Sequence, residues 1–273
     1  MEIAIISSSK DPAGVNIRNS LIKHYNFQNA NEKFDGNDVF ELNIYDKKIK
    51  LYLTNDELTH SENIDKRIDA DILVFASKHR SKENTKSFAV HSIGNWHGAE
   101  LGGKEKQLCP SSAVLMKNIF IELNNAAKDS GYEITMEATH HGPYTETPSV
   151  FVEIGSTEAE WKNEENGKII ADTIMNGLKN KNDNYKIAVG IGGPHYCSNF
   201  NKAALRTDVA FSFICPKFHL DKLDRNIIKQ AMEKTIEKID FAVLDWKGLG
   251  QEKQRIMNLL KELNIECKRT DKL

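Results

Sequence analysis

Short apolar runs that alternate with segments of helical periodicity constrain the fold of this chain more than any other feature. Ile3-Ala4-Ile5-Ile6 is followed by a turn around Asp11-Pro12 and then by apolar residues at helical spacing, from Ile17 to Tyr25. The run from Asp71 to Ala76 is continuous, as expected of a strand in a sheet that is covered on both faces. This alternation predicts an α/β protein.

The same signals place the other elements. We expect a hairpin over residues 39–53, and strands over 132–138, 150–154, 186–190, 209–214 and 241–244. Ser111 or Ser112 should cap a helix that carries Val114 to Leu123, and further helices are expected over residues 156–178, 221–238 and 250–263. Residues 88–112 have little periodicity and are expected to form a long functional loop. Since neither a repeat nor a linker is visible, we predict one domain over residues 1–273.

Composition narrows the classes of partner and compartment. The 37 Lys and Arg residues against 39 Asp and Glu residues give a net charge of -2, so a nucleic-acid partner would need a local basic patch, and DNA is not expected. The four cysteines form no CxxC pair, which indicates reduced thiols and no disulfide framework. No basic leader is present and no run approaches the roughly 18 apolar residues of a membrane span, so we expect a cytoplasmic protein.

A carboxylate and two adjacent imidazoles follow one of the predicted strands. The segment Glu137-Ala-Thr-His140-His141-Gly142-Pro143 ends in a turn signal, at the kind of strand end where sites of α/β proteins collect. Adjacent strand residues point to opposite faces, so His140 and His141 reach one metal only if Gly142 and Pro143 bend the chain. A structural, hydrogen-bonded role for one or both histidines is the alternative.

Glycines and a histidine follow the strand predicted over residues 186–190. In Gly190-Ile191-Gly192-Gly193-Pro194-His195-Tyr196 the glycines permit a turn whose amides could approach an anion or an oxyanion. A dinucleotide site is not indicated, because the third glycine of that fingerprint is missing. A tight structural turn explains the same residues equally well.

Basic and aromatic residues mark two more segments. Ser77-Lys78-His79-Arg80-Ser81-Lys82 follows an apolar strand and would suit phosphate groups, although a solvated surface turn is the alternative. Asn95-Trp96-His97 offers a ring that could stack on a base, or a partly buried loop tryptophan.

Metal chemistry is better supported than covalent catalysis. No G-x-S-x-G elbow is present, and Cys109 and Cys197 are expected to be ordinary buried thiols. Zinc accepts imidazole nitrogens and carboxylate oxygens. No H-E-x-x-H pattern fixes a ligand set, so the candidates are His97, His140, His141, His195 and either Glu137 or Glu153.

Taken together, four blocks of this sequence resemble the D-aminoacyl-tRNA deacylases of the archaeal and plant type. The blocks are Ser77-Lys78-His79-Arg80-Ser81, His91-Ser92-Ile93-Gly94-Asn95-Trp96, Thr139-His140-His141-Gly142-Pro143 and Gly192-Gly193-Pro194-His195-Tyr196. Their order and spacing match over nearly the whole chain. The resemblance implies a hydrolase that cleaves the ester between a D-amino acid and the 3′ end of tRNA. It also implies a dependence on zinc and a three-layer α/β/α fold with a mixed central sheet, similar to the phosphorylase and peptidyl-tRNA hydrolase-like group.

That reaction suggests roles for the candidate residues. We expect catalysis to involve His140, His141, His195, Glu137 and His79, and zinc to be held from among His97, His140, His141 and His195. Substrate positioning is expected from Lys78, Arg80, Asn95, Trp96, Gly192, Gly193 and Tyr196, with backbone amides of the two glycines as oxyanion donors. A nucleoside phosphorylase-like transferase and a non-catalytic tRNA-binding protein are the alternatives.

Overall fold

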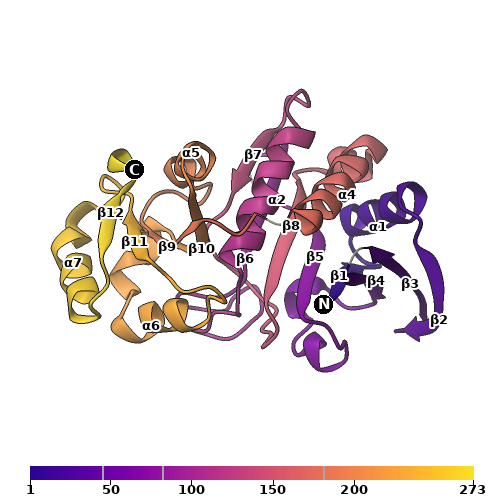
Figure 1. Cartoon of the computed structure of the whole chain (residues 1–273), viewed down its shortest axis with the longest axis horizontal. Helices are drawn as coiled ribbons and strands as arrows, with labels where there is room; N and C mark the ends of the chain where they lie inside the picture. The colour runs from indigo at the N-terminus through magenta and orange to yellow at the C-terminus, as the bar shows by residue number, and fades with distance from the viewer. Residues whose placement is uncertain (45, 82, 181) are drawn as a thin grey trace.

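Two β-sheets lie side by side in the computed structural model, which describes residues 1–44, 46–81, 83–180 and 182–273 (Figure 1). The larger sheet has eight strands in the order β2-β3-β4-β1-β5-β8-β6-β7. Their bounds are β1 Glu2–Ser8, β2 Gln28–Phe34, β3 Asn37–Ile44, β4 Lys47–Thr54, β5 Ile72–His79, β6 Ser87–Ser92, β7 Glu133–Met136 and β8 Ser149–Gly155. The sheet is mixed. Strand β3 runs antiparallel to β2 and β4, and β6 runs antiparallel to β8, whereas the other neighbouring strands are parallel.

The smaller sheet has four parallel strands in the order β10-β9-β11-β12. These strands are β9 Lys186–Ile191, β10 Val209–Cys215, β11 Phe241–Leu244 and β12 Cys267–Arg269. Helix α5 Ser198–Arg206 packs on one face of this sheet, and α6 Arg225–Glu233 and α7 Lys253–Glu262 pack on the other (Figure 1). The smaller sheet is therefore the middle of three layers.

Helices cover one face of the larger sheet. They are α1 Pro12–His24, α2 Ala113–Ala126, α3 Glu158–Lys162 and α4 Glu164–Lys179, and α2 also contacts β10 of the smaller sheet (Figure 1). The opposite face is covered by short 3-10 helices and irregular segments, whose residues Leu58, Ile64 and Ile68 pack on Phe75 and Phe151. The 3-10 helices of the described residues span Leu58–His60, Ile64–Lys66, Lys217–Lys222, Gly250–Glu252 and Thr270–Lys272.

The helix starts follow from local sequence. The Asp11 side chain accepts hydrogen bonds from the amides of Ala13 and Gly14, and Pro12 supplies a preset φ at the first helical position. Ser112 caps α2 by accepting from the Leu115 amide. A capping box between Thr157 and Glu160 opens α3.

The α/β class, the mixed sheet, the hairpin and the strands at β1, β5, β8, β9, β10 and β11 are confirmed. The helix expected over residues 156–178 is two helices, because Asn163 ends α3 and caps α4 with its own side chain. The helix expected over 221–238 is shorter, since Asp224 caps it at Arg225 and it ends at Glu233. Tyr45 at the end of the expected hairpin strand, Lys82 of the basic turn and Lys181 of a polar turn lie outside the described residues.

The prediction of a long loop from residue 88 is wrong at its start. Residues Ser87–Ser92 form β6, an entirely buried strand between β8 and β7. Serines at both ends and His91 interrupt its apolar character, so it lacks the continuous run that identifies β5. The rest of the expected functional loop is partly core, because Trp96 and Leu108 pack against the smaller sheet.

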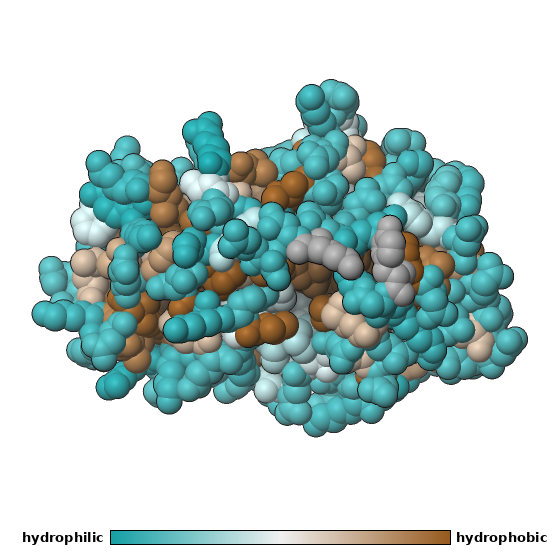
Figure 2. All heavy atoms as spheres, in the orientation of Figure 1, coloured by the Kyte–Doolittle hydropathy of each residue, from teal (hydrophilic) through white to brown (hydrophobic). Residues whose placement is uncertain are grey.

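Hydrophilic side chains cover most of the face seen in Figure 2, and hydrophobic atoms appear mainly in recesses between them. Among the described helices, none is both long enough and apolar enough to cross a membrane.

Candidate active site

Strand alternation brings three titratable side chains to one face of the larger sheet. In the β5–β8 register Ser77 faces Glu153, and in the β8–β6 register Ala89 faces Glu153. His79 and His91 each lie two residues further along, so both are diagonal neighbours of Glu153 on the same side of the sheet. The His79 Nδ1 atom lies 3.5 Å from Glu153 Oε2, and His91 Nε2 lies 3.7 Å from the same oxygen.

Glu137 is the centre of a second group. It follows β7, its amide donates to the Val90 carbonyl of β6, and its side chain is completely buried. Its Oε1 lies 3.2 Å from His79 Nδ1, while its Oε2 lies 3.3 Å from His195 Nε2 and 3.7 Å from His140 Nε2. These distances suit ion pairs, but none has hydrogen-bond geometry, and among the described residues neither oxygen has a hydrogen-bond partner. A buried carboxylate without such partners is costly unless another group binds it.

The segment around Glu137 lies between the two sheets and is bonded to both. On the side of the smaller sheet, the Ala138 amide donates to the His195 carbonyl at 2.8 Å, and the Thr139 amide donates to the Ile214 carbonyl at 2.9 Å. On the other side, the Thr139 hydroxyl pairs with the Ser92 hydroxyl at the end of β6, at 2.7 Å. These hydrogen bonds place His195, which follows β9, beside His140 and His141, which follow β7.

The chain bends at His141, where φ is 43°. The left-handed conformation places the rings of His140 and His141 beside one another, with centroids 4.3 Å apart, although adjacent residues of a strand would diverge. The expectation that the chain must bend for both imidazoles to meet is therefore confirmed, with the bend one residue before Gly142. The His91 ring lies 4.1 Å from that of His140, and the His195 ring lies 4.8 Å from it.

The carboxylates favour charge on the histidines beside them. Burial opposes protonation of His79, but Glu153 and Glu137 outweigh it and raise the pKa of His79 to about 9. Burial likewise opposes charge on His91, and Glu153 outweighs it, so the pKa of His91 is raised. In return the pKa of Glu153 is lowered despite its burial, because the charges of His79 and His91 lie beside its carboxylate.

His140 and His141 are driven the other way. Burial, followed by the positive charge of His91, lowers the pKa of His141 to about 4, and the same causes hold the pKa of His140 well below its ordinary value. Both rings are therefore neutral near pH 7. Nδ1 of His140 lies 2.8 Å from the Ala138 carbonyl and Nδ1 of His141 lies 2.6 Å from the Gly142 carbonyl, which makes Nδ1 the donor. Each Nε2 is left with a free lone pair, as in metal-binding histidines.

Three groups of these side chains have ligand atoms within 4.8 Å of one another. They are His91 with His140 and His141, Glu137 with His140 and His195, and His79 with Glu137 and Glu153. The second group combines two imidazoles with a carboxylate, which is the donor set of several catalytic zinc sites. The first would require His91 to lose a proton that Glu153 stabilises.

His97 does not belong to any of these groups. It lies in the loop after β6, where its Nδ1 is buried without a hydrogen-bond partner among the described residues. Burial, followed by the nearby His97, lowers the pKa of His219. The expectation that His97 joins the other three histidines at a metal is not supported. The convergence of His140, His141 and His195 is found as expected.

Two other expected binding residues are structural. Trp96 is 2% exposed and its Nε1–H donates to the Ile214 carbonyl, so its ring is not free to stack on a base. Asn95 is buried, and its amide donates to the carbonyls of Gly102 and Lys104, which closes the following loop. At these two positions the loop therefore offers no contact surface to a substrate.

The basic turn is only partly available. Lys78 is half-buried, with its Nζ 3.7 Å from Glu57 Oε2, and its amide donates to the Asp11 carboxylate. Arg80 is exposed and its guanidinium lies over the Trp161 ring, 5.3 Å from the centroid. Phosphate would therefore have to displace existing partners of both side chains.

The glycine loop also departs from expectation at one atom. Gly192 has φ of 101° and its amide donates to the Cys215 carbonyl at 2.8 Å, so this amide is not an oxyanion donor. Gly193 has φ of 81° and packs against Asp245. Tyr196 is better placed for chemistry, because its hydroxyl lies 3.3 Å from His79 Nε2.

Sequence reasoning gave no role to His91 and named Glu153 only as an alternative to Glu137. The signal for Glu153 is a single acid within the otherwise apolar Val150–Ile154 run. The signal for His91 is a histidine at the inward position of a strand, which is visible only once Ser87–Ser92 is recognised as β6.

Comparisons with known proteins identify the family of this chain. A family model for D-aminoacyl-tRNA deacylases matches residues 66–268. The D-aminoacyl-tRNA deacylase of Pyrococcus furiosus is 38% identical, with 96% of this chain and 97% of the relative covered, and that of Thermococcus kodakarensis is 37% identical at the same coverage. A crystal structure of a conserved protein of unknown function, AF0625, superposes with a TM-score of 0.89 at 28% identity, covering 99% of this chain and 95% of the other. The chain belongs to the D-aminoacyl-tRNA deacylase family.

Proposed function

We propose that this protein hydrolyses the ester that joins a D-amino acid to the 3′ end of tRNA, releasing the free D-amino acid and the tRNA. The observation that carries the proposal is the buried Glu137 carboxylate, which lacks hydrogen-bond partners among the described residues and faces His79, His140 and His195. The family match favours this reaction over a phosphorylase-like transfer and over tRNA binding without turnover.

The donor set also suits zinc, which would be held by Glu137, His140 and His195. Both histidines present Nε2 toward Glu137, and neutral His140 needs to release no proton to bind a cation. When bound, zinc supplies Lewis-acid chemistry, which lowers the pKa of a water and polarises a carbonyl.

The chain's own residues divide the proton transfers of the reaction. As a bond forms between the water oxygen and the ester carbonyl carbon, the water loses a proton. The Oε1 oxygen of Glu137, which faces His79 and not the two ligand histidines, is placed to accept it. As the ester bond breaks, the 3′ oxygen of the ribose needs a proton. His79 is protonated at neutral pH and faces Tyr196, so this pair is placed to donate it. Glu137 Oε1 lies beside His79 Nδ1, so the proton taken up can return to the donor.

The test of the activity compares D-Tyr-tRNA with L-Tyr-tRNA. The unaltered protein should release D-tyrosine selectively, and Glu137→Gln should lower the rate on the order of 100-fold or more. Glu133→Gln, at an exposed position four residues earlier on β7, is the matched control and should leave the rate unchanged. Equal rates for the two charged tRNAs, or an unaffected Glu137→Gln variant, would refute the proposal.

The zinc assignment has a separate test by metal content. His195→Ala should lower the bound zinc of purified protein, whereas His97→Ala should keep it, because His97 lies outside the ligand groups. Removal of zinc with a strong chelator should abolish turnover, and re-addition should restore it. Full turnover at undetectable zinc would exclude the metal role and leave the histidines and Glu137 as the whole catalytic apparatus.

A further inference from the structure

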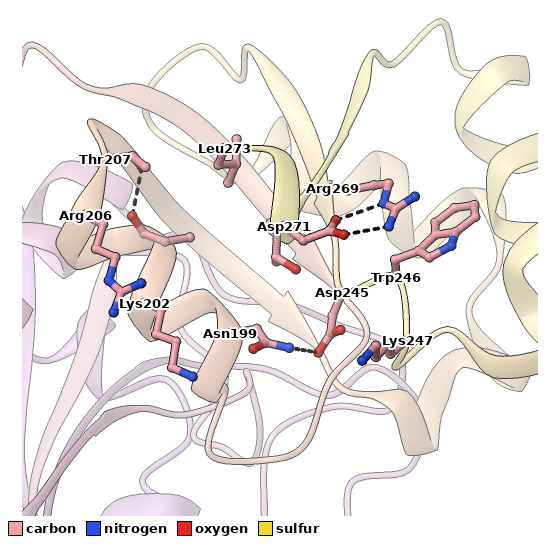
Figure 3. A pocket seen from close by; sticks show the side chains of 12 residues that line it. Asn199, Lys202, Arg206, Thr207, Asp245, Trp246, Lys247, Arg269, Asp271 and Leu273 are labelled. Atoms are coloured by element: carbon pink, nitrogen blue, oxygen red, sulfur yellow. Dashed lines mark hydrogen bonds and ion pairs between the residues drawn. The ribbon is translucent and has the colours of Figure 1, made fainter.

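A pocket of about 480 Å³, lined by mostly polar and charged residues, lies beside helix α5 (Figure 3). It is formed by α5, by the residues that follow β11 and by the C-terminal segment after β12. Sequence analysis gave this region no role.

One face of α5 lines the pocket with cations. Asn199, Lys202 and Arg206 are spaced by three and four residues, so they share a face of the helix, while Phe200 and Ala204 are buried on the other side. Lys247, after β11, adds a third cation. Across the described parts of the chain, no acidic side chain lies within 4.0 Å of these three cationic groups, and all three are exposed.

The carboxylates of the pocket are already engaged. Asp271 holds the Arg269 guanidinium in a two-point ion pair, at 2.9 and 2.6 Å (Figure 3). Asp245 is 4% exposed and accepts a hydrogen bond from Asn199 Nδ2 at 3.0 Å. The surface charge that remains open to a ligand is therefore positive.

An aromatic wall completes the pocket. The Trp246 ring lies between two cations, with Lys253 Nζ 5.1 Å and the Arg269 guanidinium carbon 4.8 Å from its centroid. Such contacts hold the cations in place and leave a half-buried ring at the edge of the pocket.

The pocket and the candidate active site share one loop. Helix α5 begins at Ser198, three residues after His195, and Asp245 packs so closely on Gly193 that a Cβ there would lie 2.9 Å from its Oδ2. Helix α5 therefore connects the segment that carries His195 to the pocket.

We infer that this pocket binds backbone phosphates of the tRNA acceptor arm, an inference that rests on the proposed function. A polyanion needs local positive charge, because the whole chain has a net charge of -2. From Asn199 to Arg206 the helix advances about 10 Å, which equals the rise of about three phosphates of one strand along the axis of a nucleic-acid duplex. Lys202, Arg206 and Lys247 would contact these phosphates, whereas the ester remains at the histidine cluster.

The test measures binding of uncharged tRNA by fluorescence anisotropy over a range of salt concentrations. The double variant Lys202→Ala/Arg206→Ala should raise the dissociation constant about tenfold and lower the slope of its salt dependence by about two, since each lost phosphate contact removes about one unit. Lys247→Ala alone should lower the slope by about one. The matched control is Arg225→Ala/Lys229→Ala on α6, which removes the same charges at the same spacing from the other face of the smaller sheet.

A second readout separates this inference from the proposed function. With a D-aminoacyl ester of adenosine, which carries no phosphate, the α5 double variant should turn over as fast as the unaltered protein. If the control variant weakens tRNA binding equally, or the double variant binds tRNA normally, the pocket is not the phosphate site. If the unaltered protein binds tRNA through the pocket but hydrolyses no D-aminoacyl ester, the proposed function fails and the assignment of the pocket stands.

Discussion

Replacing Glu153 by Gln should destabilise the protein in a way that depends on pH. Glu153 is 3% exposed and lies 3.5 Å from His79 and 3.7 Å from His91, so its charge is one of the two that keep His79 protonated inside the protein. Gln has nearly the same shape, which makes the substitution a test of charge and not of packing.

The magnitude follows from the pKa of His79. A rise from 6.5 to about 9, at about 1.4 kcal/mol per unit, corresponds to roughly 3 kcal/mol of stability. Because Glu137 retains part of this interaction, the variant should lose roughly 2 kcal/mol near neutral pH, or about 4–8 °C in melting temperature.

The sign of the pH dependence is fixed by the direction of the shift. A histidine whose pKa is raised on folding stabilises the protein fully below the unfolded pKa of 6.5, and this stability is lost as pH rises through about 9. The difference between the unaltered protein and Glu153→Gln should therefore be largest near pH 6 and vanish or reverse near pH 9.5.

Urea unfolding of the metal-depleted protein, followed by tryptophan fluorescence at both pH values, measures this difference. Glu158→Gln, which removes an exposed acid paired with Lys162, is the control and should show no measurable change. A loss in Glu153→Gln that is equal near pH 6 and near pH 9.5 would refute the assignment of the stabilisation to His79.

Three further outcomes are expected. His97→Ala should retain kcat/KM within about twofold while His140→Ala lowers it on the order of 100-fold, and similar losses in the two deacylation assays would place His97 at the site after all. Trp96→Phe should cost about 1 kcal/mol of unfolding free energy, through loss of the hydrogen bond to the Ile214 carbonyl, with KM unchanged; a raised KM would restore a binding role. Burial lowers the pKa of Lys117 to about 8, so the unaltered protein should gain stability as pH rises from 8 toward 10.5, and Lys117→Met should lack that gain in urea unfolding; parallel pH profiles would contradict the burial effect.

Strands that are buried on both faces can form a continuous apolar run, and such a run can be located from the sequence. β5 and β11 are of this kind, and both were located from sequence. β6 has the same burial but carries serine at each end and His91 within, because it delivers a side chain to the site. Its place between β8 and β7 depends on long-range pairing, which local periodicity does not contain.

The site residues that could be predicted from the sequence are those whose side chains suit the chemistry and that also follow a predicted strand. His140, His141 and His195 lie four or five residues after the ends of β7 and β9, so their convergence could be expected from these strand ends. Trp96 could not be separated from a binding residue by sequence, because burial of a loop tryptophan depends on the packing of the smaller sheet. The α5 pocket escaped notice for a similar reason, since its open cations come from α5 and from the segment after β11, which are distant in sequence.

Four histidines of the site fall into two pairs, one with raised and one with lowered pKa values, and Glu153 lies beside the raised pair. His79 and His91 lie beside Glu153 and have raised pKa values, and the charge on His91 then helps to keep the neighbouring His140 and His141 neutral. Hydrolysis of an ester near neutral pH needs a proton donor on the leaving oxygen and uncharged nitrogens near the water, and two such environments side by side supply both. Glu153 therefore acts on both halves at once: it holds the proton on His79 and, through His91, excludes one from His140.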